Sequence, residues 1–236
     1  MATTLTLEGI GSVRVVQRQN ARRVTLSVSR ATGVATMTLP PRIPMADAEA
    51  FALGQREWLT ARLGAVPEPV PFENGMTLPY RGRPTRVVRR EGRGVRLAGE
   101  TIEVGGPVEA FPAALERWLK GRARTRLRAR SEVHAARLGV TFGRIAIRDT
   151  RSRWGSCSTS GTLSYSWRPI LAPDPVLDYL AAHEVSHLRE MNHSRRFWAH
   201  VATLCPDYRE SRAWLRENGT LLHRYGRIAD TMPHPR

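Results

Sequence analysis

The stretch AAHEVSHL, residues 181–188, carries two histidines four positions apart in an otherwise apolar segment. Four residues make just over one turn of an α-helix, so both imidazoles project from one face with their Cβ atoms about 5–6 Å apart. That spacing lets His183 and His187 hold one metal ion, with the carboxylate of Glu184 beside them. The pattern H-E-x-x-H on a helix predicts a zinc site in which Glu184 is the general base.

A catalytic zinc site needs a third protein ligand and one open position. His193 follows His187 by six residues, which is too far around the helix for the same face. The helix is therefore expected to end near residues 190–192, so that the chain doubles back and brings His193 to the metal. This interval equals that of the longer H-E-x-x-H-x-x-G-x-x-H pattern, although Glu190 stands at its glycine position. We expect Asn192 to make the turn in the left-handed conformation.

Other side chains remain open as ligands. The alternatives to His193 stand on helices predicted further along the chain: His200, Asp207 and Glu210. Cys157 as a fourth ligand would close the position that water needs. The histidines could also be an ordinary, partly exposed group at a helix end. His134 and His223 lack neighbours of ligand type, so we interpret them as structural.

The residues around this helix predict an alternation of helices and strands. Asp174-Pro175 is expected to begin the helix, with Asp174 as N-cap and Pro175 at the first helical position. A long helical pattern over residues 107–138 and strand candidates at 144–149 and 162–167 precede it. Two helices are predicted after it, over residues 195–204 and 207–217, and Asn218-Gly219 is expected to end the second.

The N-terminal part is predicted to be rich in β-structure. Residues 13–39 alternate between apolar and polar in the manner of half-buried strands, a helix is predicted over residues 47–63, and residues 72–106 contain further strand-like pieces. We therefore expect an α+β chain with two domains. Residues 1–106 would form a β-rich N-terminal domain with one helix, and residues 107–236 a catalytic domain whose H-E-x-x-H helix packs on a short sheet.

The chain is strongly basic, with a formal charge of +16. Clustered cations bind phosphate by releasing counterions, so such a charge can indicate a nucleic-acid or nucleotide partner. Lys120 is the only lysine, and the arginines are scattered from Arg14 to Arg236. This distribution predicts weak nucleic-acid binding at most.

The densest run of arginines lies on the helix predicted over residues 107–138. Steps of two residues send successive side chains to opposite sides of a helix. One arc then carries three of these arginines while the other two face away: Arg122, Arg126 and Arg130 against Arg124 and Arg128. We interpret the run as a solvated helix face.

The two cysteines, Cys157 and Cys205, form no C-x-x-C pair, which is typical of a reducing compartment and argues against a zinc site built from cysteines. The first residues lack the basic start and apolar run of a signal peptide, and no segment approaches the roughly 20 apolar residues of a membrane span. We expect a cytoplasmic protein without a membrane partner. The oligomeric state is not predicted.

Three blocks of sequence resemble the YgjP-like metallopeptidase family, distant relatives of the SprT-like and WLM zincins. The blocks are RWGSCS at 153–158, WRPILAP at 167–173, and the H-E-x-x-H segment followed by NHS at 192–194 and by Phe197-Trp198. The resemblance covers about residues 10–225. It implies a zincin-like catalytic domain with zinc on His183, His187 and His193 and with Glu184 as the catalytic glutamate. The natural substrate is left open.

In the first of these blocks, Trp154 is expected to pack in the core. Gly155 and Ser156 are expected to form a tight bend that leads to a strand beside the cleft. Phe197 and Trp198 are core candidates that would seat the helix after His193.

The predicted function is a zinc-dependent hydrolase, foremost a metallopeptidase that acts on a peptide or an unfolded protein. An extended substrate could pair with the strand predicted over residues 162–167. The candidates for stabilising an oxyanion are Tyr165, Asn192, Arg153 and Tyr179. A nucleotide phosphoanhydride hydrolase is an alternative, because the same chemistry attacks phosphorus and arginines suit phosphate. A nucleic-acid-associated protein with a structural zinc site is another.

Overall fold

The structure, a computed structural model, describes residues 2–29 and 32–226. The described residues divide into two compact units, residues 2–70 and residues 71–226. The predicted domain boundary between residues 106 and 107 lies within the second unit. The division into domains 1–106 and 107–236 stays a prediction.

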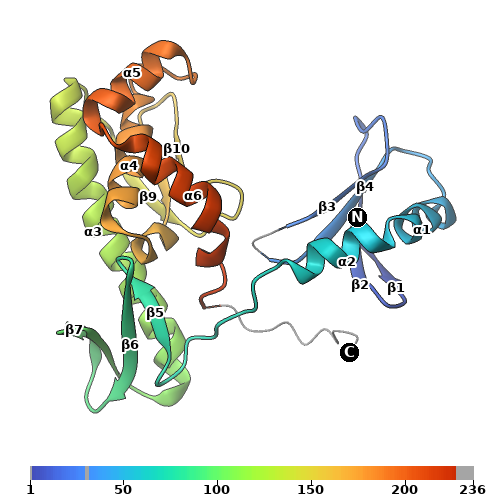
Figure 1. The fold of residues 1–236 in the computed structure, drawn as a ribbon, viewed down its shortest axis with the longest axis horizontal. Coiled ribbons are helices and arrows are strands. Elements are labelled where there is room, and N and C mark those ends of the chain that lie inside the picture. The colour runs from blue at the N-terminus through green and yellow to red at the C-terminus, as the bar shows by residue number, and fades with distance from the viewer. Residues whose placement is uncertain (1, 30–31, 227–236) are drawn as a thin grey trace. The chain divides into compact units, whose positions relative to one another are not determined.

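The first unit combines a four-stranded sheet with two helices (Figure 1). In the order β1-β2-β4-β3, β2 and β4 run parallel and the outer pairs antiparallel. The predicted helix over 47–63 is broken at Gln55, whose φ of −104° is not helical. The elements are β1 Ala2–Leu7, β2 Gly11–Gln17, β3 Thr25–Val28, β4 Ala35–Leu39, α1 Met45–Gly54 and α2 Arg56–Gly64. Their core includes Val13, Val15, Met37, Leu39, Ala52 and Leu59.

The second unit begins with a four-stranded sheet in the order β5-β6-β8-β7. Its strands are β5 Thr77–Tyr80, β6 Arg83–Arg90, β7 Gly94–Ala98 and β8 Thr101–Gly105. The turn between β5 and β6 has positive φ at Arg81 and Gly82, 55° and 77°. The backbone N–H groups of these two residues donate to the carbonyls of Ile170 and Leu171, at 2.9 and 3.1 Å. This sheet is therefore tied to the segment that leads into the H-E-x-x-H helix.

A short 3₁₀ turn, η1 Val108–Ala110, precedes the long helix α3 Phe111–Leu138. The buried stripe of α3 recurs every four residues: Leu115, Leu119, Ala123, Leu127 and Ser131. Such a stripe marks the face of a helix that packs on the core. Gly139, with a φ of 65°, ends the helix in the left-handed conformation that glycine adopts without strain.

The arginines of one arc of α3 contact other parts of the unit. Arg122 donates to the hydroxyl of Tyr80 at 3.1 Å, Arg126 pairs with Asp174 at 3.1 Å, and Arg130 pairs with Asp178 at 2.5 Å. The interpretation of this run as a solvated face is wrong for Arg126 and Arg130, which are half-buried and lie opposite acidic residues of the H-E-x-x-H helix. It holds for Arg122, Arg124 and Arg128, which are exposed.

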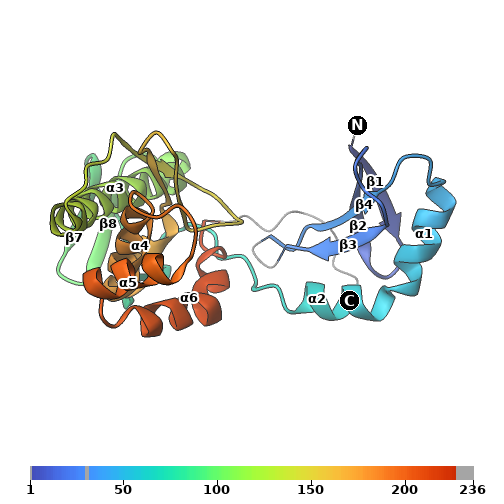
Figure 2. The ribbon, with the colours of Figure 1, turned by 90° about the horizontal axis from the view of Figure 1, so that it is seen from above.

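The rest of the second unit is a short sheet covered by helices (Figures 1 and 2). In the order β10-β11-β9, β11 is central, parallel to β9 and antiparallel to β10. Helix α4, with the H-E-x-x-H pattern, contacts α3, α5, α6 and β10. The elements are β9 Ile145–Arg148, β10 Gly155–Cys157, β11 Leu163–Ser166, η2 Arg168–Leu171, α4 Asp174–Ser186, α5 Arg195–Leu204 and α6 Tyr208–Leu222. The predicted α+β class, with the H-E-x-x-H helix on a short sheet, is confirmed.

Two predicted helix ends are wrong for reasons of tertiary packing. Pro173, not Asp174, is the N-cap of α4, because the Asp174 carboxylate accepts from Arg81 and pairs with Arg126 instead of capping the backbone. Helix α6 continues through Asn218-Gly219 to Leu222. A Cβ on Gly219 would lie 2.9 Å from the indole of Trp154, so this glycine serves close packing rather than helix termination.

No helix in the described part of the chain is both long enough and apolar enough to cross a membrane.

Candidate metal centre

The metal ligands predicted on the H-E-x-x-H helix lie at the C-terminal end of α4. His183 lies in its last turn, and His187 is the residue that caps the helix. The chain then turns tightly, with the N–H groups of Leu188 and Arg189 donating to the carbonyls of Val185 and Ser186 at 3.0 and 3.1 Å. The helix ends at Ser186, earlier than the predicted residues 190–192, and the turn after it lets the following segment return.

Asn192 contributes to the turn between His187 and His193 in a different way from the one predicted. Among the described residues other than glycine, positive φ occurs only at Arg42 and Arg81. The prediction of a left-handed Asn192 is therefore wrong. Its side-chain oxygen accepts from the N–H of Ser194 at 3.1 Å instead, which fixes the backbone directly after His193.

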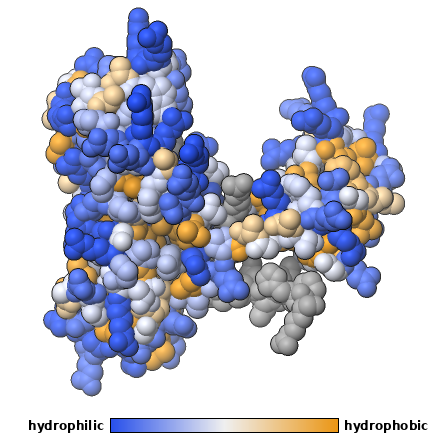
Figure 3. Space-filling view, in the orientation of Figure 1, coloured by the Kyte–Doolittle hydropathy of each residue, from blue (hydrophilic) through white to orange (hydrophobic). Residues whose placement is uncertain are grey.

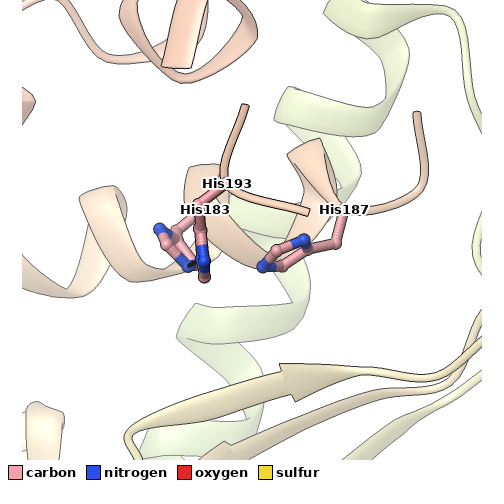
Figure 4. Close-up of side chains that lie close together, drawn as sticks. All are labelled: His183, His187 and His193. Carbon is pink, nitrogen blue, oxygen red and sulfur yellow. Dashed lines mark hydrogen bonds between the residues drawn. The ribbon is translucent and has the colours of Figure 1, made fainter. Parts of the chain in front are cut away.

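The structure brings together the rings of His183, His187 and His193. One nitrogen of each lies within 4.8 Å of the others, and Nε2 of His193 is 3.1 Å from Nε2 of His183. Figure 4 shows the ring of His187 reaching from the end of α4 toward the other two. In the described residues this is the single group of three or more potential ligands. It includes none of the predicted alternatives, His200, Asp207, Glu210 and Cys157.

Neighbouring groups orient the two rings on α4. Nδ1 of His187 lies 3.1 Å from the carbonyl oxygen of Glu190, which assigns the proton to Nδ1 and leaves the Nε2 lone pair free. Nδ1 of His183 lies 3.4 Å from the hydroxyl of Tyr179. Burial lowers the pKa of His183 to about 3, with further lowering by His187 and His193, and burial also lowers the pKa of His187. Both imidazoles are therefore neutral near pH 7, the form that binds a metal.

Aromatic side chains of α5 seat the three rings. Phe197 is fully buried, and its ring centroid lies 4.5–4.9 Å from all three imidazole centroids. Trp198 is stacked 5.8 Å from His193. The predicted core role of Phe197 is confirmed, and Trp198 is partly buried beside it. Ser194 caps α5 by accepting from the N–H of Phe197 at 3.3 Å. The start of this short helix therefore fixes His193, which precedes the cap, and Phe197, which packs against the three imidazoles.

Glu184 is 3% exposed, yet its carboxylate lines the cleft beside the histidines. Burial raises its pKa to about 8, and the positive charge of Arg153 opposes this rise. Gly155 of β10 stands against the same carboxylate. In the described part of the chain, Glu184 has no hydrogen-bond or ion-pair partner, so both oxygens are available to a molecule in the cleft.

The cleft over the histidines has a volume of about 770 Å³. It lies between β10 with the preceding segment on one side and α4 and α6 on the other. A second hollow, of about 620 Å³, adjoins it and shares His187 and Met191 with it. Together the two hollows have space for an extended peptide on both sides of the three imidazoles.

The block around Trp154 has a different local structure from the one predicted. Gly155 and Ser156 belong to strand β10 itself rather than to a bend before a strand. Trp154 is only partly buried and stacks on His223 at 4.8 Å between ring centroids. Burial raises the pKa of Cys157 to about 11, with a contribution from Glu184, so this thiol stays protonated near pH 7.

The predicted oxyanion donors separate into two groups. Tyr165 is 1% exposed and bonded to Ser131 at 2.9 Å, and Asn192 does not line the cleft, so neither is placed to donate to a molecule there. Arg153 and Tyr179 do line it. The sequence analysis missed Arg212 of α6, which also lines the cleft, because nothing in its local pattern relates it to residues 183–193.

A family model described as "YgjP-like, metallopeptidase domain" matches residues 22–218. A solved structure, of the metallopeptidase zymogen abylysin from Pyrococcus abyssi, matches with 22% sequence identity over 40% of this chain and 94% of that chain. Its TM-score of 0.36 is too low to carry an inference. The search of curated proteins found no significant match.

Proposed function

Because the chain belongs to the YgjP-like metallopeptidase family, we propose that it is a zinc peptidase in which His183, His187 and His193 hold the ion and Glu184 is the general base. The resemblance noted in the sequence is confirmed by the family match, and membership makes the chain a metal-dependent hydrolase of the peptidase type. The observation that carries the residue assignment is the convergence of three imidazole nitrogens within 4.8 Å of one another beside a buried carboxylate.

The donor set fits zinc. Bonds of about 2.0–2.1 Å in a tetrahedron place neighbouring nitrogens about 3.3 Å apart, close to the 3.1 Å between the Nε2 atoms of His183 and His193. Three imidazoles without a fourth protein ligand are the ligand set of a catalytic rather than a structural zinc site. No fourth side chain joins the group in the described part of the chain.

When bound, the ion supplies Lewis acidity. The positive charge of the ion also favours the ionised form of Glu184, whose pKa is otherwise raised to about 8 by burial. The Glu184 carboxylate accepts a proton from the attacking water and delivers it to the amine that leaves the cleaved peptide bond. Arg153 lines the cleft and is the remaining cationic donor of the predicted set, so we assign it the stabilisation of the oxyanion. Tyr179 holds the ring of His183 in place.

The edge of the short sheet supports a peptide as substrate. The prediction that a substrate pairs with residues 162–167 is wrong, because β11 lies in the middle of the sheet and is paired on both sides. Within the described residues, β10 pairs with β11 alone, and all three of its residues line the cleft. An extended peptide can add to this edge through its main chain, which requires no particular sequence.

The test combines metal analysis with activity. The purified protein should hold about one zinc ion per chain and should cleave an unfolded protein. Glu184→Gln should keep the zinc and lose at least about 1000-fold in kcat, because the general base is removed while the ligands stay. Glu190→Gln makes the same change nearby on a side chain outside the cleft lining, and its activity should stay within about twofold.

Full activity of Glu184→Gln, or its loss of zinc, would contradict the mechanism. A nucleoside triphosphate is tested in parallel, because the nucleotide and nucleic-acid alternatives stay predictions. Phosphate release without any peptide cleavage would replace the peptidase proposal by the nucleotide alternative.

A further inference from the structure

One face of α6 forms a wall of the cleft beside the metal centre. Arg212, Leu215 and Arg216 line it, and their spacing of three and four residues places them on one side of the helix. This wall brings two guanidinium groups to a cleft whose opposite side is the edge strand β10.

The guanidinium of Arg212 is held by an aromatic ring. It lies 4.6 Å over the ring of Trp198, within the range of a cation–π interaction. Trp198 in turn stacks on His193. The positive charge of Arg212 lies close enough to lower the pKa of His183. The cation is thus positioned at the border of the metal centre rather than free in solvent.

This charge is not neutralised within the protein. Arginines elsewhere around α4 are paired with carboxylates, such as Arg126 with Asp174 and Arg130 with Asp178. In residues 2–29 and 32–226, Arg212 has no carboxylate within ion-pair distance. Arg216 has only its exposed sequence neighbour Glu217, at 3.7 Å. A contact between two such exposed side chains is weak and is readily replaced by a ligand.

The cleft as a whole favours an anion. The single carboxylate that lines it is Glu184, and the cationic side chains are Arg153, Arg212 and Arg216. Figure 3 shows a face of the second unit that is mainly hydrophilic, with hydrophobic side chains scattered over it.

The adjoining hollow has a different character. Its lining is rich in hydroxyl groups, those of Thr141, Ser158, Thr159 and Ser160. The arginine there, Arg189, donates to the carbonyls of Leu138 and Gly139 at 3.2 and 2.9 Å and so caps the end of α3. Selection by charge is therefore expected on one side of the three histidines only.

We infer that the cleft selects peptides with a carboxylate on the side of the cleaved bond that lies along α6, where Arg212 and Arg216 bind it. The carboxylate can belong to an Asp or Glu side chain or to a C-terminus, because both offer the two oxygens that a guanidinium binds through paired N–H groups. This inference rests on the proposed peptidase function and adds its substrate class.

The first experiment maps cleavage sites without assuming a substrate. The zinc-loaded protein is incubated with a library of peptides cut from a whole proteome by chymotrypsin, and the new ends are identified by mass spectrometry. Asp and Glu, or a free C-terminus, should be enriched at one or two positions on a single side of the cut. Cuts without such enrichment overturn this inference alone. If no peptide is cut, the proposed peptidase function falls and this inference falls with it.

The second experiment uses matched peptides from that map, identical except for Glu, Gln or Lys at the enriched position. The wild type should cleave the Glu peptide with a kcat/KM about 5- to 20-fold above that of the Gln peptide, as expected for exposed arginines in a partly desolvated cleft. The double variant Arg212→Gln/Arg216→Gln should bring this ratio to within about twofold of one. A ratio unchanged from that of the wild type overturns the inference.

Two further variants separate recognition of charge from general damage. Arg124→Gln removes one exposed charge from α3, outside the cleft, and should leave the Glu to Gln ratio as in the wild type. Arg216→Glu should favour the Lys peptide over the Glu peptide, a reversal that misfolding cannot produce. Pairs with a free and an amidated C-terminus distinguish a terminal carboxylate from a side chain.

Discussion

Gly155 of β10 stands directly against the carboxyl group of Glu184 of α4. A Cβ added to Gly155 would lie 2.6 Å from Cδ and 2.7 Å from Cγ of Glu184, closer than real Cβ atoms approach any neighbour. The glycine is therefore required by the position of the carboxylate and not by the backbone, whose φ at this strand residue is not positive.

Gly155→Ala should push Glu184 out of its place while the three histidines stay. A misplacement of about 1 Å in a catalytic group can reduce the rate about 100-fold, so we expect a fall in kcat of that size with zinc content unchanged. Gly143→Ala is the matched control, because a Cβ there would meet its nearest neighbours at 3.8 Å. Equal activity of Gly155→Ala and wild type would show that Glu184 does not act from this position.

Local spacing was enough to place His183 and His187 on one helix face, because they are four residues apart. The six-residue step to His193 predicted that the chain doubles back and made His193 the first candidate for the third ligand, with His200, Asp207 and Glu210 as alternatives. The helix over residues 195–204 was predicted with its observed bounds, and in the structure Ser194 caps it.

The features that could not be predicted depend on contacts between distant segments. Gly155 is constrained by Glu184, which lies 29 residues away in the sequence. Asn218-Gly219 is a local stop signal, but Trp154 requires a glycine there and the helix continues. Arg212 reaches the cleft only because α6 packs beside α4. One sequence shows none of these pairings, because each belongs to the tertiary structure.

Ser194→Ala should weaken zinc binding without touching a ligand. The change removes the acceptor of the Phe197 N–H at the start of α5, which costs about 1 kcal/mol of helix stability, and it loosens His193 next to it. We expect zinc affinity to fall about 3- to 10-fold, measured by competition with a chelating dye. Ser194→Asp restores an acceptor and adds a favourable charge at the helix N-terminus, so it should recover most of the affinity. An unchanged Kd in Ser194→Ala would refute this role of the cap.

Asp178→Asn should destabilise the second unit by weakening the contact between α4 and α3. Asp178 Oδ1 lies 2.7 Å from Nε2 of the fully buried His134 and 2.5 Å from Nε of Arg130, so it links α4 to α3. Removing the charge leaves Arg130 without its carboxylate, and we expect a loss of about 2 kcal/mol in the free energy of unfolding. Tryptophan fluorescence during denaturant unfolding reports on this unit, because Trp58 alone of the six tryptophans lies outside it.

The control for that variant is Glu132→Gln. Glu132 pairs with Arg128 at 3.6 Å on the surface, with both side chains more than half exposed. Exposed pairs of this kind contribute little, so its effect should stay below about 0.5 kcal/mol. Equal effects of the two substitutions would mean that the Asp178 link is no stronger than a surface ion pair.

The same carboxylate should make the second unit sensitive to acid. Burial alone would raise the pKa of Asp178, but hydrogen bonds from His134 and Arg130 outweigh it and lower the pKa from 3.8 to about 2. A pKa lowered by folding contributes stability that is complete above the unfolded value and is lost as the pH falls through the folded one. The shift corresponds to about 2 kcal/mol, lost between about pH 4 and pH 2. Asp149 and Asp174 also have lowered pKa values, so the pH dependence of wild-type stability contains their contributions.

The contribution of Asp178 is therefore the difference in unfolding free energy between the wild type and Asp178→Asn, measured by urea unfolding at several pH values. That difference should be largest above pH 4 and should shrink toward pH 2, because protonated Asp178 no longer differs in charge from asparagine. A difference that stays constant across this range would show that the loss in the variant comes from packing and not from the charge.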